Sequence, residues 1–242
     1  MAIASLVLFL FYIQDSSSAD SLKVIIDKKD LPLIYQAGQR VVLIKKVFNG
    51  GYKVAWATFE PFETNLVTWD SDYSLYASPT QPVEGINLSG LSITQAQAQN
   101  RFIFKSDRTF SAPQSNQMLL PNQYMILNDV PYNQAESLTF GMAQAFQLNN
   151  SERQALPLNA ALVPAKQFVK FIPEDKVLIF LANNIINGTI HNQVILESDL
   201  SKIASKQLVS GSAESVATEL DFSTNKKLSV KYYPNQGKFI QQ

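Results

Sequence analysis

The sequence has no cysteine and only one histidine among its 242 residues. Without cysteine the chain forms no disulfide, no thiolate nucleophile and no zinc–thiolate site. The single histidine, His191, excludes a cluster of histidine ligands, and no Gly-x-Ser-x-Gly elbow accompanies it. It follows the Asn187-Gly188 turn, where a solvated strand residue is commoner than a catalytic base. We therefore expect a protein that is not an enzyme, with no cofactor.

Glycine and charge are also sparse. Nine glycines are scattered and form neither a dinucleotide-binding fingerprint nor a phosphate loop. Twenty Lys and Arg balance twenty Asp and Glu, and charged residues make up 17% of the chain. No long-range field attracts a phosphate backbone, so we expect no nucleic-acid partner. A surface with little net charge also lacks the repulsion that keeps copies apart, which favours self-association and a homo-oligomer.

The longest apolar run, residues 2–13, is too short to span a bilayer, which needs about 20 helical residues. Two interpretations stay open for residues 1–19. Ser17-Ser18-Ala19 before Asp20 is typical of a signal-peptidase site, which favours an extracellular or cell-surface location. Alternatively the segment is retained as a strand that docks on this sheet or on a neighbour's, because its apolar side chains avoid water. The docking side chains are Ile3, Leu6, Val7, Leu8, Phe9, Leu10, Phe11 and Ile13.

Apolar and polar residues alternate along much of the remaining chain, and this period of two indicates β-strands. The clearest strand covers residues 138–148, with Leu138, Phe140 and Met142 on one face. Two segments, Thr94–Asn100 and Asp199–Gln207, have the spacing of short helices. Many short strands without βαβ alternation predict an all-β, antiparallel β-sandwich with at most one or two short helices.

The turn signals predict local pairings and a division of the chain. Asn49-Gly50-Gly51 predicts a hairpin between residues 41–47 and 52–57. Pro173-Glu174-Asp175 and Asn187-Gly188 predict a meander of three strands over residues 168–196. The weakly anchored stretch 128–134 predicts two sandwich-like halves, residues 20–130 and 131–242, after the segment 1–19.

Aromatic residues cluster in one 21-residue segment. Trp69, Tyr73 and Tyr76 lie beside an Asp-Ser-Asp turn, where exposed rings would stack on sugars or bind a membrane surface. The competing interpretation is that these rings belong to the core. Trp56 shares a strand face with Val54 and is expected to be buried.

Carboxylates near the same turn suggest two kinds of chemistry. Asp70 and Asp72 flank Ser71 and are weak candidates for a hard cation such as calcium, although the rest of a calcium loop is missing. An ordinary turn explains the pair more simply. Glu60 and Glu63 join them as a remote candidate for a glycosidase pair.

The segments Val41–Val47, Lys53–Trp56, Val67–Trp69 and Tyr73–Ser78 resemble a loosely defined group of uncharacterised β-rich fungal and bacterial proteins. Val177–Phe180 with Asn187-Gly188-Thr189 is similar to their later portion. The resemblance implies a β-rich fold and no function.

These observations favour a non-catalytic, self-associating or structural protein that uses its N-terminal segment as a docking or linking strand. The alternative is a secreted carbohydrate-binding, lectin-like protein or a membrane-active one. A carboxylate glycosidase is the remote alternative.

Overall fold

The computed structural model describes residues 19–196 and 215–242, which form an all-β protein with two mixed, curled sheets. The first sheet has ten strands and the second has eight, and the described residues include one helix. The expected all-β, sandwich-like fold class is therefore confirmed. No helix among the described residues is long and apolar enough to cross a membrane.

The ten-stranded sheet joins both ends of the described chain. It contains β1 (Asp20–Ile25), β3 (Tyr52–Lys53), β5 (Thr64–Trp69), β6 (Ser74–Ser78), β7 (Ser92–Gln95), β11 (Ser137–Leu148), β12 (Ser151–Pro157), β13 (Asn159–Pro164), β17 (Lys227–Tyr233) and β18 (Lys238–Gln241). The eight-stranded sheet contains β2 (Gln39–Phe48), β4 (Ala57–Phe59), β8 (Asn100–Phe104), β9 (Gln114–Ser115), β10 (Tyr124–Asn128), β14 (Phe168–Asn183), β15 (Val194–Leu196) and β16 (Ser215–Asp221).

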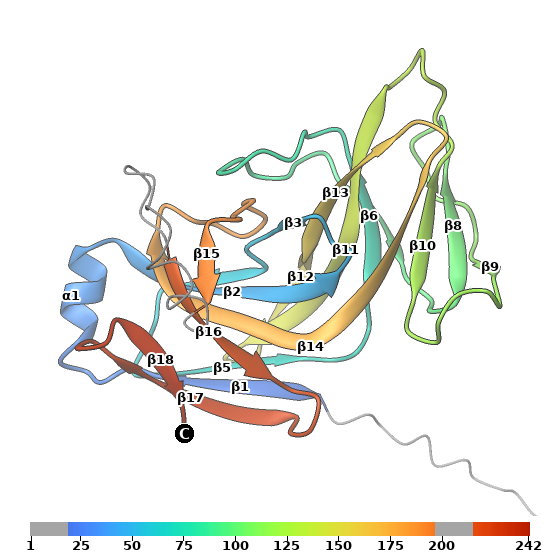
Figure 1. Cartoon of the computed structure of the whole chain (residues 1–242). Helices are drawn as coiled ribbons and strands as arrows, with labels where there is room; N and C mark the ends of the chain where they lie inside the picture. Colours follow the sequence, from blue (N-terminus) through green and yellow to red (C-terminus); the bar gives the residue numbers. More distant parts are fainter. Residues whose placement is uncertain (1–18, 197–214) are drawn as a thin grey trace, which may run out of the picture.

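Strand β1 lies between β17 and β5, which places the first described strand beside the C-terminal hairpin of β17 and β18 (Figure 1). It pairs with β17 in parallel and with β5 in antiparallel register. Parallel pairs also join β8 to β10 and β15 to β16. The other strand pairs are antiparallel, so the predicted antiparallel arrangement describes most of the pairing but not all of it.

Neither sheet divides at residue 130. In the first sheet β1 pairs with β17 and β5 pairs with β11, and in the second β2 pairs with β14. Each of these pairs joins a strand from residues 20–130 to one from residues 131–242. The two predicted segments therefore share both sheets, and the main core cluster draws side chains from both.

The main core lies between the two sheets and takes side chains from both. Strands β2 and β14 are buried on both faces, because a second apolar cluster covers their other side. Along β2, Val41 and Leu43 point into the main core, whereas Val42 and Ile44 belong to a second apolar cluster. Successive side chains of a strand alternate between its faces, so a continuous apolar run fits a strand covered on both sides.

Several local predictions from turn signals are wrong in detail. Strand β2 does turn at Asn49 and Gly51, both with positive φ, but β3 pairs with β13 and β2 pairs with β4 instead. Residues 168–183 form one long strand, β14, in which Pro173 marks a register shift rather than a turn. The long, curved course of β14 is visible in Figure 1. A register shift absorbs the irregular residues without ending the strand.

The helix predictions have two different outcomes. Thr94–Asn100 is not helical, because Thr94 belongs to β7 and Asn100 begins β8. Residues 199–207 lie outside the described residues. The helix that the structure does contain, α1 (Leu31–Gln36), begins beside Pro32 and buries Leu31 and Ile34. Proline suits a first helical turn because its missing N–H has no partner there.

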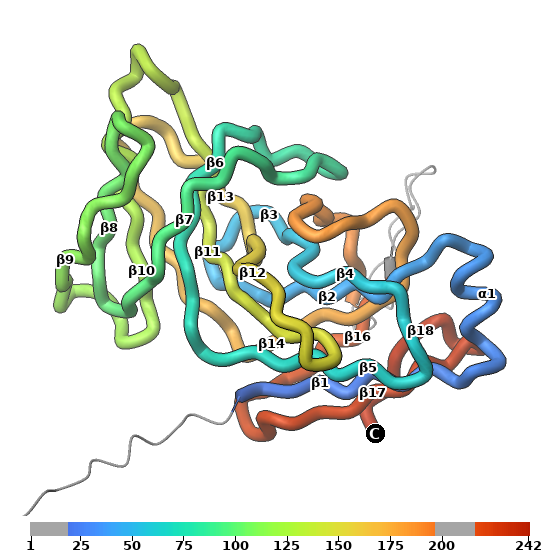
Figure 2. Tube along the Cα trace, turned by 180° about the vertical axis from the view of Figure 1, so that it is seen from behind, coloured from blue at the N-terminus to red at the C-terminus, as the bar shows by residue number. Residues whose placement is uncertain are grey.

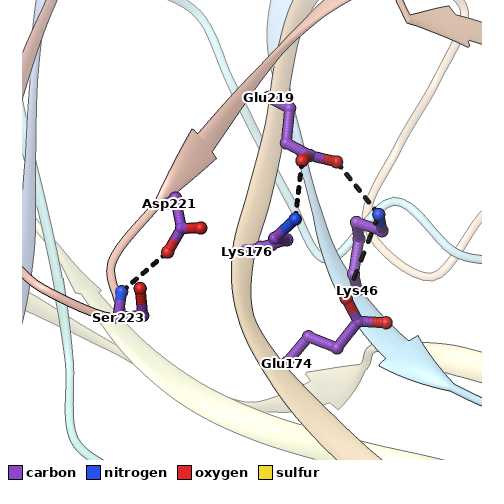
Figure 3. A network of polar contacts seen from close by, with 6 residues as sticks. All are labelled: Lys46, Glu174, Lys176, Glu219, Asp221 and Ser223. Atoms are coloured by element: carbon purple, nitrogen blue, oxygen red, sulfur yellow. Dashed lines mark hydrogen bonds and ion pairs between the residues drawn. The ribbon is translucent and has the colours of Figure 1, made fainter.

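A half-buried ion network joins three strands of the second sheet (Figure 3). Glu219 on β16 accepts hydrogen bonds from Lys46 on β2 at 2.9 Å and from Lys176 on β14 at 3.0 Å. Burial would raise the pKa of Glu219, but these two hydrogen bonds outweigh it and hold that pKa below its ordinary value. The network therefore fixes Lys46 on the face of β2 opposite to Lys45.

Candidate functional site

A cavity with a mixed polar and aromatic lining lies where β5, β11 and β12 meet the start of β1. Its volume is about 550 Å³, within the usual range for small-ligand sites. Three carboxylates and one guanidinium line it, from Asp70, Asp72, Glu152 and Arg153. The rings of Trp69 and Phe146 and the amides of Gln147 and Asn150 complete this lining. We call it the first cavity.

Strand pairing brings these residues together from distant parts of the sequence. Thr68 on β5 pairs with Gln147 on β11, which sets the end of β5 against the β11–β12 hairpin (Figure 2). Strand β12 pairs with β11, but the register shifts between Gln144 and Phe146. Bulges of this kind reorient side chains and often occur beside functional sites. Here the shift lies at Ala145, which lines the cavity.

Gln144, next to the bulge, connects the cavity wall to the protein interior. Its side-chain amide donates to the backbone oxygen of Asp70 at 2.6 Å, and its Oε1 accepts from Lys45 Nζ at 2.7 Å. Its backbone oxygen accepts from the indole N–H of Trp56 at 2.9 Å. The loop that carries Asp70 is therefore held by a buried amide.

Lys45 itself lies in a cage of aromatic rings. Its Nζ lies 5.5 Å from the ring centroid of Trp56, 5.1 Å from that of Trp69 and 5.4 Å from that of Tyr73. All three distances are within the range of cation–π attraction. Because only 3% of Lys45 is exposed, its ammonium group has exchanged water for ring faces and one amide oxygen.

Burial lowers the pKa of Lys45 from its ordinary value of 10.5 to about 7. The nearby carboxylates of Asp20 and Asp175 act in the opposite direction and oppose part of this fall. Both acids also lie near Lys226, at 3.4 Å and 3.7 Å from its Nζ. The pKa of Lys45 therefore lies near neutral pH, and its ammonium group lies behind Trp69, which lines the first cavity.

Two polar atoms in this region are buried and have no hydrogen-bond partner among the described residues. They are the indole N–H of Trp69 and Oδ1 of Asp20, whose contact with Lys226 at 3.4 Å lacks hydrogen-bond geometry. These residues are directly paired across β1 and β5. Buried polar groups normally have partners, so this paired position beside the first cavity is unsatisfied within the described residues.

The predicted exposed aromatic platform is wrong for two of its three residues. Tyr76 is fully buried, and its hydroxyl donates to the backbone oxygen of Asn159 at 2.5 Å. Trp69 is 3% exposed and contacts Trp56 and Phe222 edge to face. Tyr73 is partly buried beside Lys45. The core interpretation is right for both rings, because Trp69 on β5 belongs to the main core cluster and Tyr76 on β6 belongs to a separate apolar cluster on the other face of that strand. Trp56 is buried as expected.

The carboxylates also separate. Asp70 and Asp72 both line the first cavity, whereas Glu60 pairs with Arg40 at 3.1 Å and lines a different, smaller cavity. Glu63 does not line the first cavity. Among the described residues no three acidic or histidine side chains gather closely enough to hold a metal ion, so the cation interpretation of Asp70 and Asp72 lacks further ligands.

His191 is not the solvated residue that its turn position indicates. Its side chain is 12% exposed, stacks on Phe180, and its Nδ1 lies 2.9 Å from Glu84. Glu84 also accepts from the backbone N–H of Asn192. The pair ties the turn at 83–86 to the turn at 186–189, and no serine of residues 19–196 or 215–242 hydrogen-bonds to His191.

No family model, curated protein or solved structure matches this chain. The function therefore has to be argued from the chemistry of the site, because a fold alone does not specify one.

The sequence analysis does not predict four residues that form the first cavity or support its wall: Lys45, Gln144, Glu152 and Arg153. Lys45 left a signal, because it occupies the core face of β2 in register with Val41 and Leu43. The other three left none, because their approach to Asp70 depends on the pairing of β5 with β11.

Proposed function

We propose that this protein is a non-catalytic binding protein whose first cavity takes a small sugar, neutral or amino-bearing. The observation that carries the proposal is the convergence of Asp70 and Asp72 with Glu152 and Arg153 around one cavity. Carboxylates and amides accept hydrogen bonds from sugar hydroxyls, and the guanidinium of Arg153 donates. Three carboxylates against one cation favour an amino sugar over an acidic one.

The two tryptophans provide the test. In ¹⁵N-resolved spectra of the full chain, the indole N–H of Trp69 should shift when a ligand fills the first cavity, because Trp69 lines it and its N–H has no partner in the described structure. The indole N–H of Trp56 is bonded to Gln144 and serves as the internal control. The probes are methyl α-mannoside, methyl α-galactoside, N-acetylglucosamine, glucosamine and glucuronic acid.

We expect Trp69 to shift with at least one neutral or amino sugar and not with glucuronic acid. Asp70→Asn should weaken that binding by about tenfold, as expected for losing a hydrogen bond to a charged group. Asp107→Asn, at an exposed residue between β8 and β9, is the matched control. A Trp69 signal that no sugar moves, or an acidic sugar that binds best, contradicts the proposal.

Self-association is a second candidate, and one surface feature favours it. Val83, Ile86 and Ile186 are 55%, 45% and 53% exposed on two adjoining turns. Asn87 donates to the backbone oxygen of Asn187 and joins these turns. Glu84 is the only charged residue in 79–91 and 183–193, and His191 pairs with it. Exposed aliphatic side chains with little charge around them are typical of association surfaces.

Sedimentation velocity tests this candidate. If the two turns form the contact, the double substitution Val83→Asp and Ile186→Asp should convert an oligomer to the monomer. The predicted linking role of the apolar side chains Ile3 to Ile13 lies outside the described residues and needs its own deletion of residues 1–19. A chain that is monomeric from the outset rules out both.

A further inference from the structure

A second cavity lies between α1 and the hairpin of β17 and β18, which are neighbours in both views of the chain (Figures 1 and 2). Its volume is about 480 Å³. The first cavity includes Ala19, just before β1, and the second includes Asp27 and Asp30, just after it. The two cavities are therefore separated by the six residues of β1, about 20 Å of extended chain.

The feature that marks this second cavity is an unsatisfied carboxylate. Asp30 lines the cavity and is only 7% exposed, and its Oδ2 is buried with no hydrogen-bond partner in the described residues. Although Asp30 directly precedes α1, its side chain makes no capping hydrogen bond. A buried carboxylate oxygen without a donor is costly, and such groups normally have partners. Because the Oδ2 position itself is closed to solvent, a ligand meets the Asp30 carboxylate from the side that lines the cavity.

The rest of the lining indicates which kind of donor fits. Asp27 pairs with Lys231 at 2.9 Å, and Lys29 adds a second ammonium group to balance Asp30. The charges of the lining therefore cancel, so it favours an uncharged ligand over an ion. Tyr232 and Tyr233 add two partly exposed rings. Carboxylate, amine and tyrosine ring together match the hydroxyls and the C–H face of a sugar.

We propose that the second cavity binds a neutral saccharide, with Asp30 accepting a hydrogen bond from a sugar hydroxyl. The rings of Tyr232 and Tyr233 contact the apolar face of the sugar. This site does not depend on the first cavity. The consequence that one chain carries two sugar sites, at opposite ends of β1, does rest on the function proposed above.

The test follows the ring signals of Tyr232 and Tyr233 in ¹³C-tyrosine-labelled full chain, assigned with Tyr232→Phe and Tyr233→Phe. Methyl α-mannoside, methyl α-galactoside and N-acetylglucosamine are the probes. We expect at least one probe to move both signals, and Asp30→Asn and Asp30→Ala to weaken that response by about tenfold or more. Asp107→Asn, an exposed Asp→Asn change elsewhere, should leave it unchanged.

Circular dichroism and the unchanged signals of the other tyrosines check that each variant is folded. If Asp30→Ala does not fold, Asp30→Asn decides, because it keeps the shape of the side chain. Tyrosine signals that no probe moves, or that move equally in wild type and in the folded Asp30 variants, overturn the proposal. The Trp69 signal reports the first cavity in the same titrations, so failure of one site is distinguishable from failure of the other.

Discussion

At the scale of single residues, Lys45 is the most unusual group of the described chain. Three rings and Gln144 replace its hydration, and burial brings its pKa to about 7. The alternation along β2 places this residue on the core face, where a lysine is rarely found. The sequence therefore predicts that Lys45 lies on the core face of β2. It does not predict the rings and the amide around Lys45, because they come from segments distant in the chain.

The lowered pKa of Lys45 predicts how stability depends on pH. Between about pH 7 and 10 the unfolded chain holds a proton on Lys45 that the folded chain has released, so the free energy of unfolding should rise with pH. The expected slope from this group is up to about 1.4 kcal/mol per pH unit. Urea unfolding at several pH values measures it, and the Lys45→Met variant should lack this component. Equal slopes in both proteins contradict the prediction.

Above pH 10 the direction should reverse. Burial raises the pKa of Tyr73, Tyr76 and Tyr124, so the unfolded chain releases these protons first and stability falls as pH increases. Spectrophotometric titration of tyrosinate at 295 nm should show these three hydroxyls ionising at higher pH than the exposed tyrosines do. Normal titration of all tyrosines in the folded state would show that the three hydroxyls are not buried.

At the scale of elements, β11 organises the site. It pairs with β5, β6, β12 and β13, and its bulge at Ala145 faces the first cavity. The strand itself was predictable because Leu138, Phe140 and Met142 alternate regularly. Its four partners were not, because alternation says which face is buried and nothing about which strand lies alongside. The same limit explains why β3 pairs with β13, although the turn at residues 49–51 predicts that it pairs with β2.

Gly141 on β11 provides a test of this packing. A Cβ atom there would collide with the backbone oxygen of Asn159 and would lie 2.5 Å from the ring of Tyr76. Gly141→Ala should therefore lower the free energy of unfolding by about 3 kcal/mol, as overpacking does. Gly38→Ala is the control: it has positive φ but open space, and should cost only about 1 kcal/mol. Chemical denaturation compares them, and equal losses contradict the packing.

At the scale of the whole molecule, the chain folds as one interleaved structure. Strand β1 needs β5 and β17 as partners, and β2 needs β14, so each half of the sequence leaves unpaired edges in the other's absence. The stretch at 128–134 looked like a boundary because few apolar residues anchor it. Asn128 is buried and donates to the backbone oxygen of Val163, and Val130 is buried in the main core, so polar and apolar contacts both hold this stretch.

We accordingly predict that the fragments 20–130 and 131–242 do not fold when expressed separately. Unpaired strands and divided cores expose apolar surface that cannot be covered within either fragment. Circular dichroism and thermal melting of each fragment test this, with the full chain as reference. A cooperative melt in either fragment would show that the halves are independent after all.

The two proposed sugar sites lead to a prediction for the intact chain. Sites at opposite ends of β1 should let one molecule bridge two glycans and precipitate a sugar-bearing polymer. Asp70→Asn and Asp30→Asn should each prevent precipitation while leaving binding to the remaining site detectable by titration. Precipitation that survives in both single variants excludes bridging by these sites and directs attention to the self-association surface.

The sequence by itself determined that the chain is all-β, that it lacks the residues for thiol or multi-histidine chemistry, and that the loop at 69–72 carries acids beside a tryptophan. Those properties are local, set by composition and by a period of two. Only the tertiary structure decided which strands pair, that Trp69 and Tyr76 turn inward, and that Glu152, Arg153 and Asp30 complete cavities. Contacts between residues tens of positions apart depend on register and edge pairing, which alternation alone does not encode.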